Sequence, residues 1–233
     1  MSLTEGVMEQ KRIAGAKAAE YIEDGMILGL GTGSTAYYLT EKVSELVLSG
    51  MDIKAVPTSK DTEKLAEKFG IPLISIDRVD RIDLAIDGVD EIDPCFNAIK
   101  GGGGALFREK IVADMAETVI WIMAENKLVE RIGAFPLPVE VLPFGYTYVI
   151  RRLKEFSFRP ALRMKAGKPY VTDNGNYIMD IPIENTMDIQ DIAEKLNSIT
   201  GIVETGLFLN KCKRIIVGTD QGVRIIENQL HGI

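Results

Sequence analysis

The sequence predicts an α/β fold, in which a mainly parallel sheet has helices on both faces, together with a smaller α+β domain. Short apolar segments alternate with amphipathic helical segments through the first half of the chain, as in parallel sheets that are buried on both faces. Pro136, Pro138 and Pro143 then punctuate an expected connection. After these prolines, strand-like segments surround a single helical segment, which indicates an α+β unit.

Each element of the first half is justified by its apolar pattern and by the residues at its ends. The first helix is expected around Ala14 to Ile22, where apolar residues recur at helical spacing before Asp24-Gly25 breaks the pattern. Short apolar runs predict strands at 26–30, 52–56, 71–76, 82–86 and 118–123. Cap and stop residues predict the intervening helices: Ser34 or Thr35 with Gly50, Ser59 with Gly70, and 105–116 after a glycine run.

The second half is justified in the same way. Segments 170–172 and 177–179 are expected to be strands around the turn Asp173-Asn174-Gly175-Asn176. Segment 189–199 has apolar residues at helical spacing. Further strands are expected at 202–209, 214–218 and 223–226. The predicted domains are therefore residues 1–130 with 208–233, and residues 131–207.

Composition excludes several classes of protein. The 233 residues have a net charge of −7, which argues against a nucleic-acid partner. The one His, His231, lies close to the C-terminus, so a His-based triad or metal site is not expected. Cys95 and Cys212 lie far apart and fit a reducing compartment. No apolar run is long enough to span a bilayer, so we expect a cytoplasmic protein without a membrane partner.

The first motif that carries chemistry is the glycine-rich segment 29–35, between a predicted strand and a predicted helix. Its glycines let backbone N–H groups approach an anion, and the helix N-terminus adds partial positive charge. Thr32, Ser34 and Thr35 add hydroxyl groups. The alternatives are a tight turn without a ligand and a dinucleotide site. A dinucleotide site would need an acidic residue that binds the ribose, and the sequence lacks one at the expected position. A small phosphate ester therefore fits better.

The second motif is the acidic segment 87–93, which follows the predicted strand at 82–86. It contains four carboxylates in seven residues. If it lies at the carboxyl end of a parallel strand, it faces the crevice where such sheets bind ligands. Proton transfer is the functional interpretation. A solvated loop and a divalent-metal site are the alternatives, although the spacing of a calcium-binding loop is absent.

The third motif is Lys100 followed by Gly101 to Gly104, which leads into the helix expected at 105–116. A flexible linker is one alternative. A backbone that must approach a ligand closely explains the glycines better. Glu109 falls about one turn into that helix, on a side that can face the loop.

Together, GLGTGSTA, DGVDEID and KGGGGALFREK resemble the type A ribose-5-phosphate isomerase family, as does the segment PLPVEV. The likeness covers essentially the whole chain. It implies a Rossmann-like domain and a ferredoxin-like domain, assembled as a homodimer or homotetramer. It also implies interconversion of ribose 5-phosphate and ribulose 5-phosphate in the non-oxidative pentose phosphate pathway, without metal or organic cofactor. Thr205 stands where many members carry His.

The resemblance also implies the residues of the site. Glu109 matches the catalytic base. Substrate contacts match the following residues: Thr32, Gly33, Ser34, Thr35, Asp87, Gly88, Val89, Asp90, Lys100, Gly101, Gly102, Gly103, Lys127 and, more loosely, Lys11.

The chemistry of isomerisation suggests how the catalytic residues divide the work. One base moves a proton between C1 and C2, which we assign to Glu109. Lys100 and the glycine amides would stabilise the enediolate. Asp87 would open the sugar ring, and Asp90 would hold hydroxyls or orient Lys100. A non-catalytic sugar-phosphate sensor is the alternative function.

Overall fold

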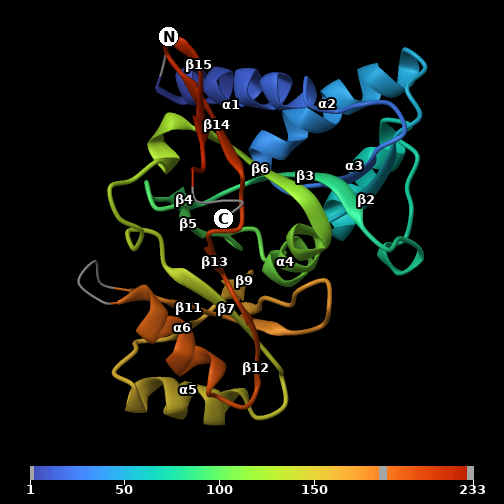
Figure 1. Cartoon of the computed structure of the whole chain (residues 1–233). Helices are drawn as coiled ribbons and strands as arrows, with labels where there is room; N and C mark the ends of the chain where they lie inside the picture. Colours follow the sequence, from blue (N-terminus) through green and yellow to red (C-terminus); the bar gives the residue numbers. More distant parts are fainter. Residues whose placement is uncertain (1–2, 184–187, 230–233) are drawn as a thin grey trace. The chain divides into compact units, whose positions relative to one another are not determined.

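The computed structural model describes residues 3–183 and 188–229, so His231 lies outside the described residues. The chain groups into two units (Figure 1). The first unit comprises Met1–Val89, Arg108–Leu128 and Asn210–Ile233, and the second comprises Asp90–Phe107 and Val129–Leu209. This grouping places residues 90–107 in the second unit. The domain limits expected from the sequence stay a prediction.

The first unit is built on a mainly parallel sheet, as the sequence predicts. Neighbouring strands pair in parallel except for the last pair, β14 and β15, which is antiparallel. The strand order is β15-β14-β6-β3-β1-β2. The strands are β1 (Ile27–Leu30), β2 (Lys54–Pro57), β3 (Ile82–Gly88), β6 (Ala116–Ala124), β14 (Arg214–Thr219) and β15 (Gly222–Glu227).

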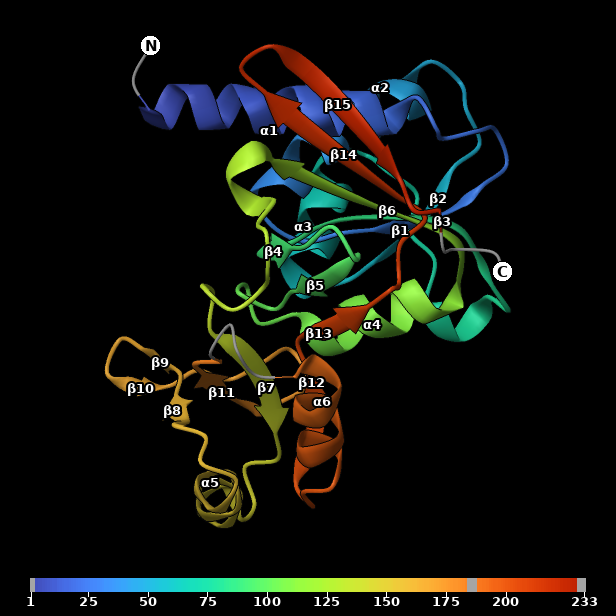
Figure 2. The same cartoon turned by 60° about the vertical axis from the view of Figure 1, so that its left-hand side comes forward.

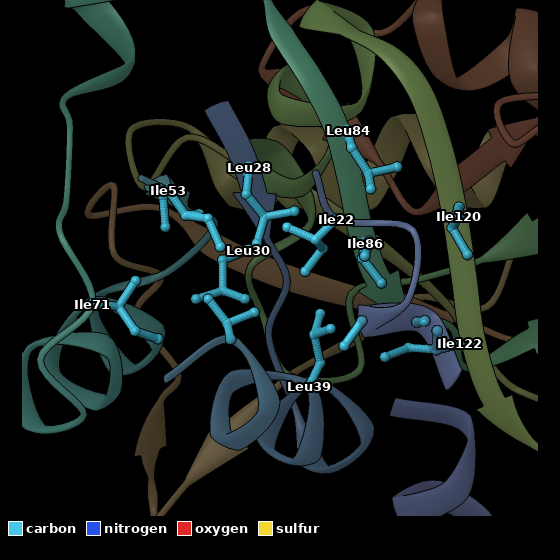
Figure 3. Close-up of a cluster of buried hydrophobic side chains, with 14 of the residues drawn as sticks. Ile22, Leu28, Leu30, Leu39, Ile53, Ile71, Leu84, Ile86, Ile120 and Ile122 are labelled. Atoms are coloured by element: carbon cyan, nitrogen blue, oxygen red, sulfur yellow. The ribbon is translucent and has the colours of Figure 1, made fainter. Parts of the chain in front are cut away.

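Helices cover both faces of this sheet, which confirms the predicted fold class. Helices α1 (Leu3–Ala19), α2 (Ser34–Leu48) and α3 (Lys60–Lys68) contribute to one core with strand residues such as Leu28 and Ile86 (Figure 3). Figures 1 and 2 show α4 (Leu106–Met115) on the opposite side of the sheet from α1 and α2. A Cβ on Gly29 would lie 2.5 Å from Val112 of α4, so glycine lets that helix pack closely.

The predicted helix boundaries have mixed outcomes. Ser59 caps α3, because its side chain accepts a hydrogen bond from the Thr62 amide at 3.0 Å. The expected cap of α2 by Ser34 or Thr35 is wrong: Gly33 is the N-cap residue, with φ of 106° and no side-chain cap bond. Glycine adopts this left-handed backbone without strain, so the chain enters α2 with uncapped N–H groups.

Two strand predictions are wrong, one in the first unit at 71–76 and one in the second unit at 170–172. Segment 71–76 is not a strand, because only Leu73 bridges Ala55 before the 3-10 helix η1 (Ile76–Arg78). Segment 170–172 is not a strand either. The Thr172 amide donates to the Asn176 carbonyl at 2.8 Å and closes the predicted turn instead.

The second unit combines an antiparallel sheet with two helices, which confirms the predicted α+β character. Its sheet order is β12-β7-β11-β8, and α5 and α6 share a core with it. These elements are β7 (Leu137–Val141), α5 (Tyr146–Glu155), β8 (Ala161–Leu162), β11 (Tyr177–Ile181), α6 (Ile189–Asn197) and β12 (Ile202–Thr205). A hairpin of β9 (Met164–Lys165) and β10 (Lys168–Pro169) and a sheet of β4 (Glu91–Ile92), β5 (Asn97–Ile99) and β13 (Leu207–Leu209) complete it.

Two predictions for this unit need correction. The proline-rich segment expected to be a connection contains β7, a fully buried strand that pairs with β11 and β12. The strand expected at 202–209 divides at Gly206, whose amide donates to the Pro138 carbonyl at 2.7 Å. A Cβ on Gly206 would lie 2.3 Å from the Lys100 carbonyl oxygen, so only glycine fits where the chain changes sheets.

Candidate functional site

The first two sequence motifs meet at the carboxyl ends of β1 and β3. These strands are parallel neighbours with Leu30 opposite Ile86. Oδ1 of Asp87 accepts hydrogen bonds from the amides of Thr32 at 2.9 Å and Gly88 at 2.7 Å. A Cβ on Gly31 would lie 2.2 Å from the same oxygen. The glycine-rich segment is therefore shaped to hold the Asp87 carboxylate, which is 3% exposed.

The N-terminus of α2 carries the polar groups expected of a phosphate site. The amides of the first turn of a helix lack intrahelical acceptors and attract anions. Ser34 is exposed and receives a hydrogen bond from Nζ of Lys11 at 2.9 Å, while Thr35 is buried. Lys11 belongs to α1, so the packing of two helices brings this cation to the loop.

The hydroxyl group of Thr32 has a structural task. It lies within hydrogen-bonding distance of Thr58 at 2.7 Å, Ser59 at 2.8 Å and Thr62 at 3.0 Å. Thr62 in turn donates to the Gly31 carbonyl at 3.0 Å. This hydroxyl cluster fixes the loop against the start of α3, and Ser34 and Thr35 carry the hydroxyls of the α2 N-terminus.

The four carboxylates of the acidic segment have different tasks. Glu91 accepts hydrogen bonds from the amides of Gly133 at 2.8 Å and Phe135 at 2.7 Å. Asp93 accepts them from the amides of Cys95 at 2.9 Å and Asn97 at 3.0 Å. These two carboxylates therefore hold turns outside the predicted site. Asp87 and Asp90 also bind backbone amides, but those of Thr32 and Gly102 within the predicted site, so they stay the candidates for chemistry.

The metal alternative for this segment gains no support. Within residues 3–183 and 188–229, no group of three or more His, Cys, Asp or Glu side chains is arranged to hold a metal ion. The same described residues include no helix that is long and apolar enough to cross a membrane.

Asp90 shapes the glycine loop, which we define as Gly101 to Gly104. Oδ2 of Asp90 accepts a hydrogen bond from the Gly102 amide at 2.7 Å. A Cβ on Gly102 would lie 2.5 Å from Oδ1 of Asp90. Gly101 and Gly104 have φ of 97° and 84°, so L side chains would strain the loop. The glycine run therefore forms a defined loop. Close contact with Asp90 and the positive φ angles explain much of its glycine content.

Lys100 precedes the glycine loop and is 2% exposed. Its amide donates to the Gly206 carbonyl at 2.9 Å, and its Nζ lies 5.5 Å from the ring centroid of Phe208. Gly206 and Phe208, at the start of β13, therefore contact the backbone and the ammonium group of Lys100.

Glu109 and Lys127 lie in the first unit. Glu109 occupies the first turn of α4 and is 6% exposed. It lies one turn before Val112, the residue that packs against the sheet at Gly29. Lys127 ends the 3-10 helix η2 (Glu125–Lys127), which follows β6 at the same sheet edge as the loops after β1 and β3.

The predicted residues thus fall into two groups. The first unit holds Lys11, Thr32, Gly33, Ser34, Thr35, Asp87, Gly88, Val89, Glu109 and Lys127. The second unit holds Asp90, Lys100, Gly101, Gly102 and Gly103.

Sequence reasoning missed the residues that bind the glycine loop from its carbonyl side. Nη1 of Arg163 donates to the carbonyls of Gly101 at 2.9 Å and Gly102 at 3.1 Å. The Tyr170 hydroxyl donates to the Gly103 carbonyl at 3.1 Å. No local signal could have found these residues, because they lie about 60 positions further along the chain.

Comparisons with known proteins point to one family. The sequence model of ribose 5-phosphate isomerase A (phosphoriboisomerase A) matches residues 54–222. Ribose-5-phosphate isomerase A of Listeria monocytogenes is 51% identical over 217 residues, which cover 93% of this chain and 97% of that protein. The Streptococcus gordonii protein of the same name is 48% identical over 218 residues, with the same coverage.

Solved structures give the same answer. A D-ribose-5-phosphate isomerase in complex with phospho-erythronic acid superposes with a TM-score of 0.91 and 42% identity, covering 95% of this chain and 99% of that one. The ribose 5-phosphate isomerase of Plasmodium falciparum superposes with a TM-score of 0.89 and 38% identity, at the same coverage.

Proposed function

The chain belongs to the ribose 5-phosphate isomerase A family, and from that premise we propose how it interconverts D-ribose 5-phosphate and D-ribulose 5-phosphate. It is an aldose-ketose isomerase, and the reaction passes through an enediolate. The observation that carries this function is identity near 50% over more than nine tenths of the chain with enzymes of that name. The chemistry requires a base, a stabiliser of negative charge, a ring-opening group and a phosphate site.

Glu109 is the base that moves the proton between C1 and C2. A single carboxylate can reach two adjacent carbons, so one residue suffices for both proton transfers. Burial of Glu109 in the first turn of α4 supports this role, because the surrounding atoms restrict the rotamers of its side chain. Such a base contributes roughly 10²- to 10⁴-fold to the rate.

Lys100 and the amides of Gly101 to Gly103 stabilise the enediolate oxygens. Preorganised donors of this kind are usually the largest contribution to catalysis, because they need no reorientation when charge develops. Burial of Lys100 and the fixed backbone of the loop support the assignment. Asp90 binds the Gly102 amide and thereby fixes the loop, which leaves the amides of Gly101 and Gly103 as donors to the enediolate.

Asp87 is the ring-opening acid/base, since most of the substrate is cyclic in solution. The two amides that bind its Oδ1 fix the orientation of the carboxylate. Asp90 holds substrate hydroxyls or orients Lys100. Gly88 and Val89, which lie between Asp87 and Asp90 in the sequence, contribute backbone contacts to the substrate.

The phosphate binds at the N-terminus of α2, with Gly33, Ser34 and Thr35. The chain has a net charge of −7 and the phosphate is roughly doubly negative at pH 7, so local positive charge must overcome repulsion. The uncapped amides of α2 and the cation of Lys11 beside Ser34 supply it. Lys127 is the second cation in this proposal.

The proposal extends to the cellular context. The enzyme works in the non-oxidative pentose phosphate pathway, in the cytoplasm, and without metal or organic cofactor. It assembles as a homodimer or homotetramer through the second unit, where Leu142, Phe144 and Tyr148 are exposed apolar side chains. Light scattering on the purified protein measures the assembly, and a monomer would contradict this part.

The activity is tested by adding ribose 5-phosphate to the purified protein and measuring ribulose 5-phosphate. Turnover is expected, with much slower conversion of arabinose 5-phosphate, which serves as the specificity control. Binding of ribose 5-phosphate without turnover would instead favour the sugar-phosphate sensor.

The role of Glu109 is tested by Glu109→Gln, which keeps the size of the side chain and removes the base. We expect kcat to fall by about 10²- to 10⁴-fold, with KM changed little. The exposed residue Glu130 provides the control, and Glu130→Gln should retain normal kcat. Near-normal turnover of Glu109→Gln would move the base elsewhere, first to Asp87.

A further inference from the structure

The carbonyl side of the glycine loop is bound by side chains that none of the predicted roles uses. Arg163 donates to the carbonyls of Gly101 and Gly102 through the same nitrogen, at 2.9 Å and 3.1 Å. Tyr170 donates to the next carbonyl, that of Gly103. Three consecutive carbonyls of a flexible sequence are therefore held by two side chains of the same unit.

These contacts also set the direction of the amides. In a planar trans peptide the C=O and the following N–H point in opposite directions. Fixing the carbonyl of Gly101 directs the Gly102 amide, which meets Asp90 at 2.7 Å. Fixing the carbonyl of Gly102 directs the Gly103 amide to the side of the loop away from Arg163. A cation on the carbonyl also polarises the peptide and makes its N–H a stronger donor.

Arg163 is itself held rigidly. Its Nε and Nη2 donate to the two carboxylate oxygens of Asp180 on β11, at 2.9 Å and 2.5 Å. Its amide donates to the Ile178 carbonyl at 2.8 Å. The side chain of Arg163 is only 15% exposed. A planar guanidinium can bind a carboxylate on one edge and carbonyls through its remaining nitrogen, which an ammonium group cannot do in the same geometry.

Tyr170 reinforces the same arrangement. Its amide donates to the Arg163 carbonyl at 2.8 Å, and its ring centroid lies 5.9 Å from Cζ of Arg163. A Cβ on Gly104 would lie 2.3 Å from the Tyr170 hydroxyl, so the fourth glycine admits this side chain.

We propose that Arg163, oriented by Asp180, is a positioning residue for the isomerisation. It holds the glycine loop so that the Gly103 amide faces the oxygens of the enediolate and stabilises their negative charge. This inference rests on the proposed role of Gly101 to Gly103. It makes the small sheet of the second unit a part of the catalytic apparatus, because Asp180 and Arg163 connect β11 to the loop.

The test compares Arg163→Met, Arg163→Lys and the wild-type enzyme. For Arg163→Met we expect kcat to fall about 10- to 100-fold, less than the roughly 10²- to 10³-fold that loss of a donor itself costs. KM for ribose 5-phosphate should change less than about threefold, because the effect falls on the transition state. Arg163→Lys should recover only a small part of kcat.

Inhibition by phospho-erythronic acid gives a second kinetic readout, because its carboxylate resembles the enediolate oxygens in charge. Its inhibition constant should rise in Arg163→Met by more than KM does. The matched control is Arg214→Met, which removes another partly buried arginine–carboxylate pair, with Glu227, in the first unit. The control should keep the kcat, KM and inhibition constant of the wild type.

Hydrogen exchange of the loop amides tests the positioning without using activity. Peptides that cover residues 100–106 should exchange faster in Arg163→Met, while those of the parallel sheet should not change. Unchanged loop exchange, an unchanged kcat, or a rise in KM alone would each overturn the proposal. A wild-type protein that does not turn over ribose 5-phosphate would instead remove the proposed function, a result that the exchange measurement does not depend on.

Discussion

Single residues show how the fold deals with buried charge. Glu140 in β7 has no exposed surface. Its Oε1 accepts hydrogen bonds from Thr172 at 2.9 Å, Asn174 at 3.2 Å and Asn176 at 2.9 Å. A buried carboxylate is tolerated only where such donors replace water. Glu140 therefore anchors the turn at 172–176 to the central strand of the small sheet.

Removal of this anchor should destabilise the protein strongly. Glu140→Ala leaves the donors of Thr172, Asn174 and Asn176 without this acceptor, and the hydroxyl of Thr172 is buried. We expect the free energy of unfolding to fall by about 1–3 kcal/mol. Glu140→Gln retains an acceptor oxygen and should cost less. Urea unfolding measures both changes, with Glu130→Ala on the exposed surface as the control. Equal effects of the two alanine variants would show that the anchor contributes nothing.

The two cysteines should differ in reactivity. Cys212 is fully buried, and burial raises the pKa of its thiol far above the ordinary value, whereas Cys95 is exposed. A thiol reagent at pH 8 should modify one cysteine in the folded protein and two in urea. Rapid modification of both in the folded protein would contradict this prediction.

The same pKa shift predicts a loss of stability at high pH. The unfolded state releases the thiol proton at the ordinary pKa, whereas the folded state retains it. Stability is therefore unaffected below the ordinary thiol pKa, near 8.5, and falls above it by up to about 1.4 kcal/mol per pH unit. Cys212→Ala should lack this part of the decline between pH 8 and 10, measured by urea unfolding.

Whole elements bring distant charges to the loops. Helix α1 packs along α2, and the Nζ of Lys11 reaches Ser34 at the start of α2. The glycine-rich motif predicted Ser34, and the family resemblance added Lys11. Only the packing of the helices shows why a lysine near the N-terminus belongs with a loop more than 20 residues away.

Lys11→Met should therefore weaken phosphate binding. We expect KM for ribose 5-phosphate to rise about 5- to 10-fold, equivalent to roughly 1 kcal/mol, while kcat changes little because the phosphate takes no part in the chemistry. Lys17→Met is the control on the same helix, since Lys17 pairs with Glu20 on the exposed surface. A change in kcat at constant KM would assign Lys11 a different role.

The elements also show where sequence prediction succeeds. Strands such as β1, β3 and β6 are nearly continuous apolar runs, and α3 carries its own cap at Ser59. Their signals are local, so the sequence predicts them well. Prediction fails at β7, because Pro138 in the sequence indicates a connection and not a strand. The strand forms through antiparallel pairing with β11 and β12, which are distant in the sequence.

At the scale of the whole molecule, the proposed site stabilises negative charge with side chains and backbone amides alone. All four carboxylates in the acidic segment already accept hydrogen bonds from backbone amides. We therefore expect full turnover after exhaustive dialysis against a chelator, measured with ribose 5-phosphate in metal-free buffer. Activity that disappears and returns with Mg²⁺ would support the metal interpretation of this segment.

The sequence by itself determined the class of fold, the three glycine- and carboxylate-rich motifs, and the family. These depend on residues close together in the chain, whose spacing expresses helix, strand and turn geometry directly. Only the tertiary structure decided which backbone amides each carboxylate binds and why Gly206 divides a strand. It also decided that Arg163 and Tyr170 bind the carbonyls of the glycine loop. Those answers depend on contacts between residues far apart in sequence, and a local pattern carries no record of such contacts.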